Sequence, residues 1–149
     1  MQRTSSAMAQ SSDPLLLLDT HVWIWETSAT GQLSSHVRAR INDAAEAGRL
    51  RLSLISAWEI SLLAARSRID LGRPTASWIA EAVRQSRIVF EPVTVEIAIE
   101  AGHLPDGFRS DPADQIIVAT ARITGAELVT RDRRILDYAA RGHLTAQAA

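Results

Sequence analysis

A continuous apolar run near the start of the chain is the feature that most restricts its fold. Pro14 is followed by four leucines at positions 15–18, and the run ends at Asp19 and Thr20. A strand with one face in solvent alternates apolar and polar residues, whereas a strand without that alternation is buried on both faces. Such burial requires covering layers on both sides of the sheet. The run therefore predicts an inner strand of an α/β sheet.

The rest of the chain alternates between strand-like and helix-like patterns. Further strands are expected at residues 50–55, 88–90 and 127–130, with an edge strand at 143–145. Helices are expected at residues 34–47, 56–66, 94–101 and 132–140, and in segments that begin at Pro74 and at Asp111. This order predicts an α/β sandwich with a mainly parallel central sheet. Because the sequence holds no repeat or linker, we expect one domain over residues 14–149, preceded by a flexible lead-in over residues 1–13.

The composition excludes several classes of function. The chain has no cysteine, which rules out disulfides, thiolate metal sites and thiol catalysis. All 16 basic residues are arginine, so the lysine of a Walker-A loop or a Schiff-base mechanism is missing. The net charge of −1 gives no overall basic surface for nucleic acid. No apolar run is long enough to span a bilayer and the first residues lack the apolar stretch of a secretory signal, so we expect a cytoplasmic protein.

Acidic residues follow the predicted strands at the places where a parallel sheet binds its ligands. Asp19 ends the first strand, Glu59 lies in the first turn of the helix after the second, and Asp132 follows the fourth. Asp114 lies in the first turn of the helix that Asp111 precedes. Ligands of open parallel sheets bind outside the carboxyl ends of the strands. If these helices start at one edge of the sheet, the carboxylates converge.

Each acid also has a purely structural interpretation, which stays open at this point. Glu59 fits a capping box with the serine three residues before it, Asp111 and Asp132 fit N-caps, and Asp19 fits an Asx-turn. As a set, carboxylates within about 4–6 Å of one another repel and must take up protons or bind a cation. Oxygen ligands alone favour Mg²⁺ or Mn²⁺, which can activate water against a phosphodiester.

Four segments that carry these acids resemble those of PIN-domain proteins, in particular the VapC-type toxins of bacterial type II toxin–antitoxin systems. They are LLDTHVW at 17–23, SAWEI at 56–60, DPADQIIVATA at 111–121 and LVTRD at 128–132. Their order and spacing match, and the resemblance runs from about residue 15 to residue 144. It implies a three-layer α/β/α sandwich and a Mg²⁺- or Mn²⁺-dependent endoribonuclease, with tRNA as the expected RNA substrate. It also implies a cognate VapB-type antitoxin and a homodimer.

The resemblance assigns roles to individual residues. The acidic quartet, which would bind the metal and act in catalysis, consists of Asp19, Glu59, Asp114 and Asp132. The auxiliary residues, whose hydroxyl, backbone N–H or carboxylate groups would lie near the metal or phosphate, are Thr20, Thr130 and Asp111.

A small basic patch follows the fourth strand. Arg131 and Arg133 are candidates for RNA binding, with Arg134 beside them, and a solvated helix face is the alternative. Many relatives have arginine where this chain has Gln115, and often histidine where it has Arg109, which puts substrate contacts at those positions in doubt.

The aromatic residues after Asp19 have two interpretations. Trp23 and Trp25 are expected to pack, and stacking on bases or on an antitoxin helix is the alternative. Trp58 and Trp78 are expected in the core or at an interface between protomers. For His21 we expect no catalytic role, because isolated histidines are usually structural.

Three other functions compete with a ribonuclease. A PIN domain that binds RNA or antitoxin without cutting is one, although the intact acidic quartet argues against it. A phospho-acceptor receiver domain also places acids at strand ends, but it needs a lysine that this chain lacks. A flap-type DNA nuclease needs larger helical insertions than 149 residues can hold.

Overall fold

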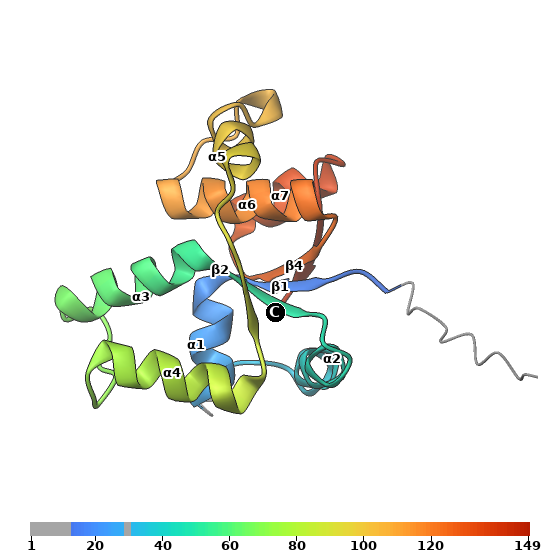
Figure 1. The fold of residues 1–149 in the computed structure, drawn as a ribbon. Helices are drawn as coiled ribbons and strands as arrows, with labels where there is room; N and C mark the ends of the chain where they lie inside the picture. The colour runs from blue at the N-terminus through green and yellow to red at the C-terminus, as the bar shows by residue number, and fades with distance from the viewer. Residues whose placement is uncertain (1–12, 29–30) are drawn as a thin grey trace, which may run out of the picture.

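A five-stranded parallel sheet forms the centre of the computed structural model, which describes residues 13–28 and 31–149 (Figure 1). The strand order is β3-β2-β1-β4-β5, so β1 lies in the middle and pairs with β2 and β4. The strands are β1 (Leu16–Leu18), β2 (Leu50–Ser53), β3 (Val89–Glu91), β4 (Glu127–Thr130) and β5 (Thr145–Ala148). Most of the predicted lead-in, residues 1–12, lies outside the described residues.

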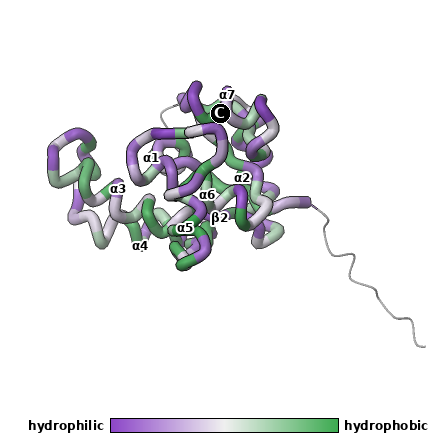
Figure 2. Tube along the Cα trace, turned by 90° about the horizontal axis from the view of Figure 1, so that it is seen from above, coloured by the Kyte–Doolittle hydropathy of each residue, from purple (hydrophilic) through white to green (hydrophobic). Residues whose placement is uncertain are grey.

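Helices cover both faces of this sheet, which confirms the predicted α/β/α sandwich. In Figure 1, α5, α6 and α7 lie above the sheet and α1, α2 and α4 lie below it, while α3 and α4 extend together to one side. Figure 2 shows the same extension of α3 and α4 from above. The helices are α1 (Thr20–Ser28), α2 (Ser35–Glu46), α3 (Leu54–Ala65), α4 (Thr75–Ser86), α5 (Val95–Gly102), α6 (Pro112–Thr124) and α7 (Arg133–Ala140).

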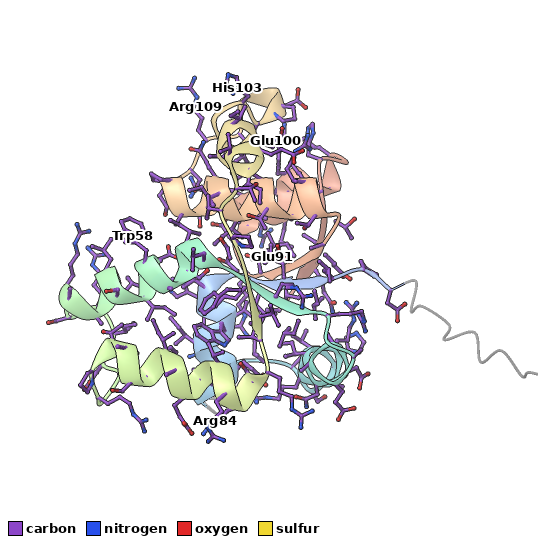
Figure 3. All side chains as sticks on the ribbon, in the orientation of Figure 1. Trp58, Arg84, Glu91, Glu100, His103 and Arg109 are labelled. Carbon is purple, nitrogen blue, oxygen red and sulfur yellow. The ribbon has the colours of Figure 1, made fainter. Side chains whose placement is uncertain are left out.

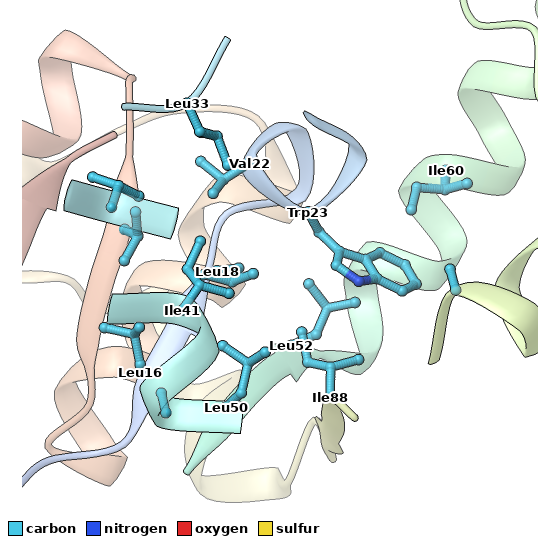
Figure 4. Close-up of a cluster of buried hydrophobic side chains, with 14 residues drawn as sticks. Leu16, Leu18, Val22, Trp23, Leu33, Ile41, Leu50, Leu52, Ile60 and Ile88 are labelled. Carbon is cyan, nitrogen blue, oxygen red and sulfur yellow. The ribbon is translucent and has the colours of Figure 1, made fainter. Parts of the chain in front are cut away.

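The leucine run divides the interior into two clusters. Leu16 and Leu18 face the cluster under α1, α2 and α4, whereas Leu17 faces the cluster under α5, α6 and α7. All three leucines are almost fully buried, as a strand covered on both faces requires. Figure 4 shows the first cluster, in which Ile41 lies among the β1 and β2 leucines and Trp23 lies to their side, toward Ile60 and Ile88. Trp23 packs edge-on against Trp78, with ring centroids 5.4 Å apart.

The clearest differences from the predicted boundaries lie at β2 and at the edge strand. β2 ends at Ser53, two residues early, because the Ser53 hydroxyl accepts a hydrogen bond from Ile55 N–H and begins α3. The segment after Asp19, for which the sequence allowed either a short turn or a helix, forms the nine-residue helix α1. The edge strand lies at Thr145–Ala148, two residues later than predicted, where it pairs with β4. Across the described ranges, we find no helix long and apolar enough to cross a membrane.

Candidate active site

A cleft of about 360 Å³ lies at the carboxyl ends of the strands, and five acids line it. Because the strands are parallel, the residues that follow them emerge at the same edge of the sheet. The acids are Asp19 after β1, Glu59 on α3, Asp111 and Asp114 at the start of α6, and Asp132 before α7. The structure thus brings together all four members of the predicted quartet and the auxiliary Asp111.

Three of these carboxylates form a tight group. One oxygen from each of Glu59, Asp111 and Asp114 lies within 4.8 Å of the others. Burial, with a smaller contribution from the charges of Asp111, Asp19 and Asp132, raises the pKa of Asp114 to about 6 against the hydrogen bond from Ser110, which lowers it. The site therefore holds its negative charge at an energetic cost, which a bound cation relieves.

Asp19 is fixed by hydrogen bonds to both carboxylate oxygens. Its Oδ1 accepts from Thr20 N–H at 2.8 Å, and its Oδ2 accepts from the Thr130 hydroxyl at 2.7 Å. The Thr130 oxygen in turn accepts from Asp132 N–H at 3.0 Å. Only 8% of Asp19 is exposed, and this burial raises the pKa of its carboxyl despite both hydrogen bonds. The two threonines that were predicted near the metal or phosphate therefore contact Asp19 directly.

Glu59 points to the cleft and does not complete the capping box that the sequence also allowed. The N-cap of α3 is Ser53, so Ser56 lies inside the helix, where it is fully buried. The Ser56 hydroxyl lies 2.8 Å from that of Thr20, which forms a hydrogen bond to Glu59. Burial, followed by the charges of Asp19 and Asp111, raises the pKa of Glu59. Ser56 is thus a buried support of the cleft, a role that sequence reasoning missed.

Asp111 and Asp132 do cap helices, as their structural interpretation predicted. Asp111 Oδ1 accepts from Asp114 N–H at 3.0 Å, and Asp132 Oδ1 accepts from Arg134 N–H at 2.9 Å. A carboxylate has two oxygens, so capping does not prevent either residue from facing the cleft. The capping interpretation is confirmed for both residues, and both also line the cleft.

Ser110 and Gln115 hold the loop before α6 in place. Ser110 Oγ donates to Asp114 Oδ2 at 2.7 Å and accepts from Arg134 Nη2 at 2.9 Å. Gln115 Nε2 donates to the Ala101 carbonyl of α5 at 2.9 Å, and its Oε1 accepts from Ser110 N–H at 3.4 Å. Sequence reasoning treated Gln115 as a doubtful substrate contact and missed Ser110, because neither contact follows from local sequence spacing.

The basic residues divide into two groups. Arg131 and Arg134 line the cleft, together with His21 and Trp25 of α1. Arg133 is exposed and does not line it, although it was predicted beside Arg131 as a candidate for RNA binding. Arg109 is exposed on the loop after α5, and Figure 3 shows its side chain pointing away from the body.

Comparisons with known proteins agree with this geometry. Residues 16–141 match the family described as PIN domain. Over 123 residues the chain is 38% identical to Ribonuclease VapC22 of Mycobacterium tuberculosis, which covers 83% of this chain and 91% of that relative. The fold matches the crystal structure of VapBC2 from Rickettsia felis bound to a DNA fragment from their promoter, with a TM-score of 0.65 and 15% identity. That match covers 90% of this chain and 98% of the solved one.

Proposed function

The chain belongs to the PIN domain family, and from that premise we propose that it is a metal-dependent endoribonuclease of the VapC type. The observation that carries the proposal is the group of carboxylates at the carboxyl ends of β1 and β4, built on α3 and α6. The relative with 38% identity is named a ribonuclease, which supports RNA as the substrate.

The donor set fits a hard divalent cation. Every acidic group of the cleft offers carboxylate oxygen, and the chain has no cysteine. Mg²⁺ and Mn²⁺ prefer such ligands, whereas zinc sites commonly include nitrogen or sulfur. We infer that Asp19, Glu59, Asp114 and Asp132 hold the ion, with Asp111 contributing charge to the same centre. When bound, Mg²⁺ or Mn²⁺ lowers the pKa of water and neutralises charge on the phosphodiester.

The protein's own part in the reaction is to hold these carboxylates in fixed orientations. Thr20 N–H and the Thr130 hydroxyl fix both oxygens of Asp19. The Ser56 and Thr20 hydroxyls support Glu59, and Ser110 fixes one oxygen of Asp114. Groups held in this way need little reorganisation when a phosphodiester enters the cleft.

The family also suggests an antitoxin and a second copy of the chain as protein partners. We propose that a cognate VapB-type antitoxin neutralises the chain and that two copies form a homodimer. Two pairs of exposed apolar side chains, each pair one helical turn apart on α3 or on α5, support contacts with other proteins, because exposed apolar patches are typical of interfaces. Their exposed fractions are 49% for Leu54, 51% for Trp58, 77% for Val95 and 60% for Ile99. For Trp58 this exposure excludes the predicted place in the core of the protomer.

The test of the enzyme is cleavage of total cellular RNA with Mg²⁺, with Mn²⁺ and with EDTA, followed by mapping of the cut ends. We expect cuts with either ion, none in EDTA, and recovery on adding excess Mg²⁺. Cleavage that persists in EDTA would contradict metal dependence. A chain that binds antitoxin and RNA but cuts no RNA with any divalent ion would instead be a non-cutting PIN module. The cut map also tests whether tRNA is the substrate.

A further inference from the structure

One wall of the cleft is aromatic and cationic rather than acidic. Trp25 and His21 lie one turn apart on α1, so they share a face of the helix. Their ring centroids are 6.1 Å apart and their planes are inclined by 52°. Arg131, from the loop after β4, lies over the Trp25 ring with Cζ 4.5 Å from its centroid. All three residues line the same cleft as the acids.

Two contacts hold Arg131 in place, one with an aromatic ring and one with an oxygen of Ala149, the last residue of the sequence. Trp25 supports its guanidinium from one side, and Arg131 Nε donates to the Ala149 backbone oxygen at 3.3 Å. Neither partner is a side-chain carboxylate. Arg134, the other arginine of the cleft, donates to Ser110 and lies 3.9 Å from Asp132, so its charge is directed at the acids. Arg131 is therefore the cation best placed to meet an incoming ligand.

A polyanion that approaches this cleft meets five carboxylates, which repel its phosphates. A bound divalent ion offsets that repulsion only at the acids, and the adjoining nucleotides need a contact of their own. Planar guanidinium groups and aromatic rings are the surfaces on which proteins stack unpaired bases, and arginine adds attraction for the phosphate. The Arg131–Trp25 pair offers both features beside the acids.

We propose that Arg131, supported by Trp25, is a platform that binds an unpaired nucleotide beside the phosphodiester to be cut. This proposal rests on the ribonuclease function proposed above. A base inside an A-form duplex is stacked on its neighbours and has no free face for such a platform. The enzyme therefore selects single-stranded segments or loops, and Arg131 determines that selection.

The first test measures RNA binding with the full chain in an Asp19→Asn background, which prevents cleavage during the measurement. The probes are a fluorescent single-stranded oligoribonucleotide and the duplex of the same sequence. Arg131→Ala should weaken single-strand binding by about tenfold or more, as loss of a stacked base does. The matched control is Arg133→Ala, which removes an exposed arginine two residues away that does not line the cleft. We expect the control to change binding less than about twofold, and neither variant to change the weak duplex binding much.

The second test separates a planar platform from a simple positive charge. Arg131→Lys keeps the charge but loses the plane, so we expect it to bind single strands almost as poorly as Arg131→Ala. Trp25→Leu should weaken binding in the same direction, and its thermal unfolding midpoint shows whether the fold survives. In the otherwise wild-type enzyme, Arg131→Ala should raise KM more than it lowers kcat.

Three outcomes would overturn the platform. They are equal loss in Arg131→Ala and Arg133→Ala, recovery of binding by Arg131→Lys, and an equal loss of duplex binding. Each of them leaves the ribonuclease proposal intact, provided that the wild type still cuts RNA. Conversely, absence of cleavage in the wild type contradicts the ribonuclease but leaves the binding comparison between Arg131 and Arg133 valid.

Discussion

Acidic residues near the two ends of the inner strands β1 and β4 differ in how far arginines compensate them. At the edge where the strands begin, Arg40 pairs with Glu127 at 2.8 Å and Arg122 pairs with Glu100 at 2.7 Å. At the edge where they end, five carboxylates share one cleft. Of these five, and counting ion pairs only among the described residues, Asp132 alone has an arginine within 4 Å, at 3.9 Å.

The difference shows that acidity alone does not mark the site. Both edges carry acids on strands or helices, and the chain has 16 arginines with which to neutralise them. At one edge the charges are compensated and contribute to the fold. At the other, the five carboxylates of the cleft are concentrated and partly buried, and apart from Asp132 beside Arg134 they have hydrogen-bond donors rather than arginines as partners. Uncompensated carboxylates of this kind cost free energy and are typical of functional sites.

The largest effect should come from removing one of the five carboxylates of the cleft, which we call the uncompensated edge. Asp19→Asn keeps the size of the side chain but removes the charge between Thr20 and Thr130. We expect RNA cleavage to fall more than about a hundredfold, because even the partners of metal ligands cost 10- to 100-fold when lost. The control is Asp43→Asn on the exposed face of α2, which should leave the cleavage rate unchanged. Full activity of the Asp19 variant would remove Asp19 from the site.

A divalent cation that binds to the carboxylates of the cleft should raise the free energy of unfolding. We expect Mn²⁺ at about 100 times its Kd to raise stability by about 2.7 kcal/mol, or several degrees in Tm. Asp114→Asn should lose most of this Mn²⁺-dependent shift, measured by thermal unfolding with and without EDTA. An equal shift in wild type and variant would mean that the ion binds elsewhere on the chain.

The edge where the strands begin, whose acids are paired with arginines, is the compensated edge. Breaking one of its ion pairs should affect stability and not catalysis. Arg40→Ala leaves Glu127, whose side chain is 15% exposed, without its guanidinium. We expect a loss of about 1–2 kcal/mol in the free energy of unfolding, since a mostly buried carboxylate loses its main partner. Denaturant titration measures the loss, while kcat of the folded fraction should stay within about twofold of wild type. A loss of activity at unchanged stability would show that the two edges are coupled.

The sequence could predict which acids meet, because that depends on one rule and on clear patterns. The leucine run indicated a strand buried on both faces, and parallel strands place Asp19 and Asp132 at one edge. Asp111 and Pro112 fixed the start of α6 and with it the place of Asp114. These features are local, so the convergence followed from the order of elements.

Contacts between side chains of different elements could not be predicted in this way. Leu54 and Ile55 suit a strand as well as a helix, so the Ser53 cap, and with it the place of Ser56 against Thr20, became clear only in the structure. Arg131 and Arg133 have equal status in the sequence, yet only Arg131 reaches the cleft. The partner that distinguishes it, Trp25, lies more than 100 residues away in the chain.

The smallest expected effect is a pH dependence confined to the uncompensated edge. Burial and neighbouring carboxylates raise the pKa of Asp114 from 3.8 to about 6, so between these values the folded chain binds more protons than the unfolded chain. Stability of the metal-free protein should therefore increase as pH falls from 7 to about 5, where this carboxyl takes up its proton. In Asp114→Asn, which cannot ionise at this position, the increase measured by thermal unfolding in EDTA should be smaller.

The Arg40→Ala variant should keep the wild-type increase, because it alters the other edge. Identical pH profiles for the wild type and Asp114→Asn would show that the acids of the cleft are already compensated without a metal ion, and the contrast between the two edges would then be lost.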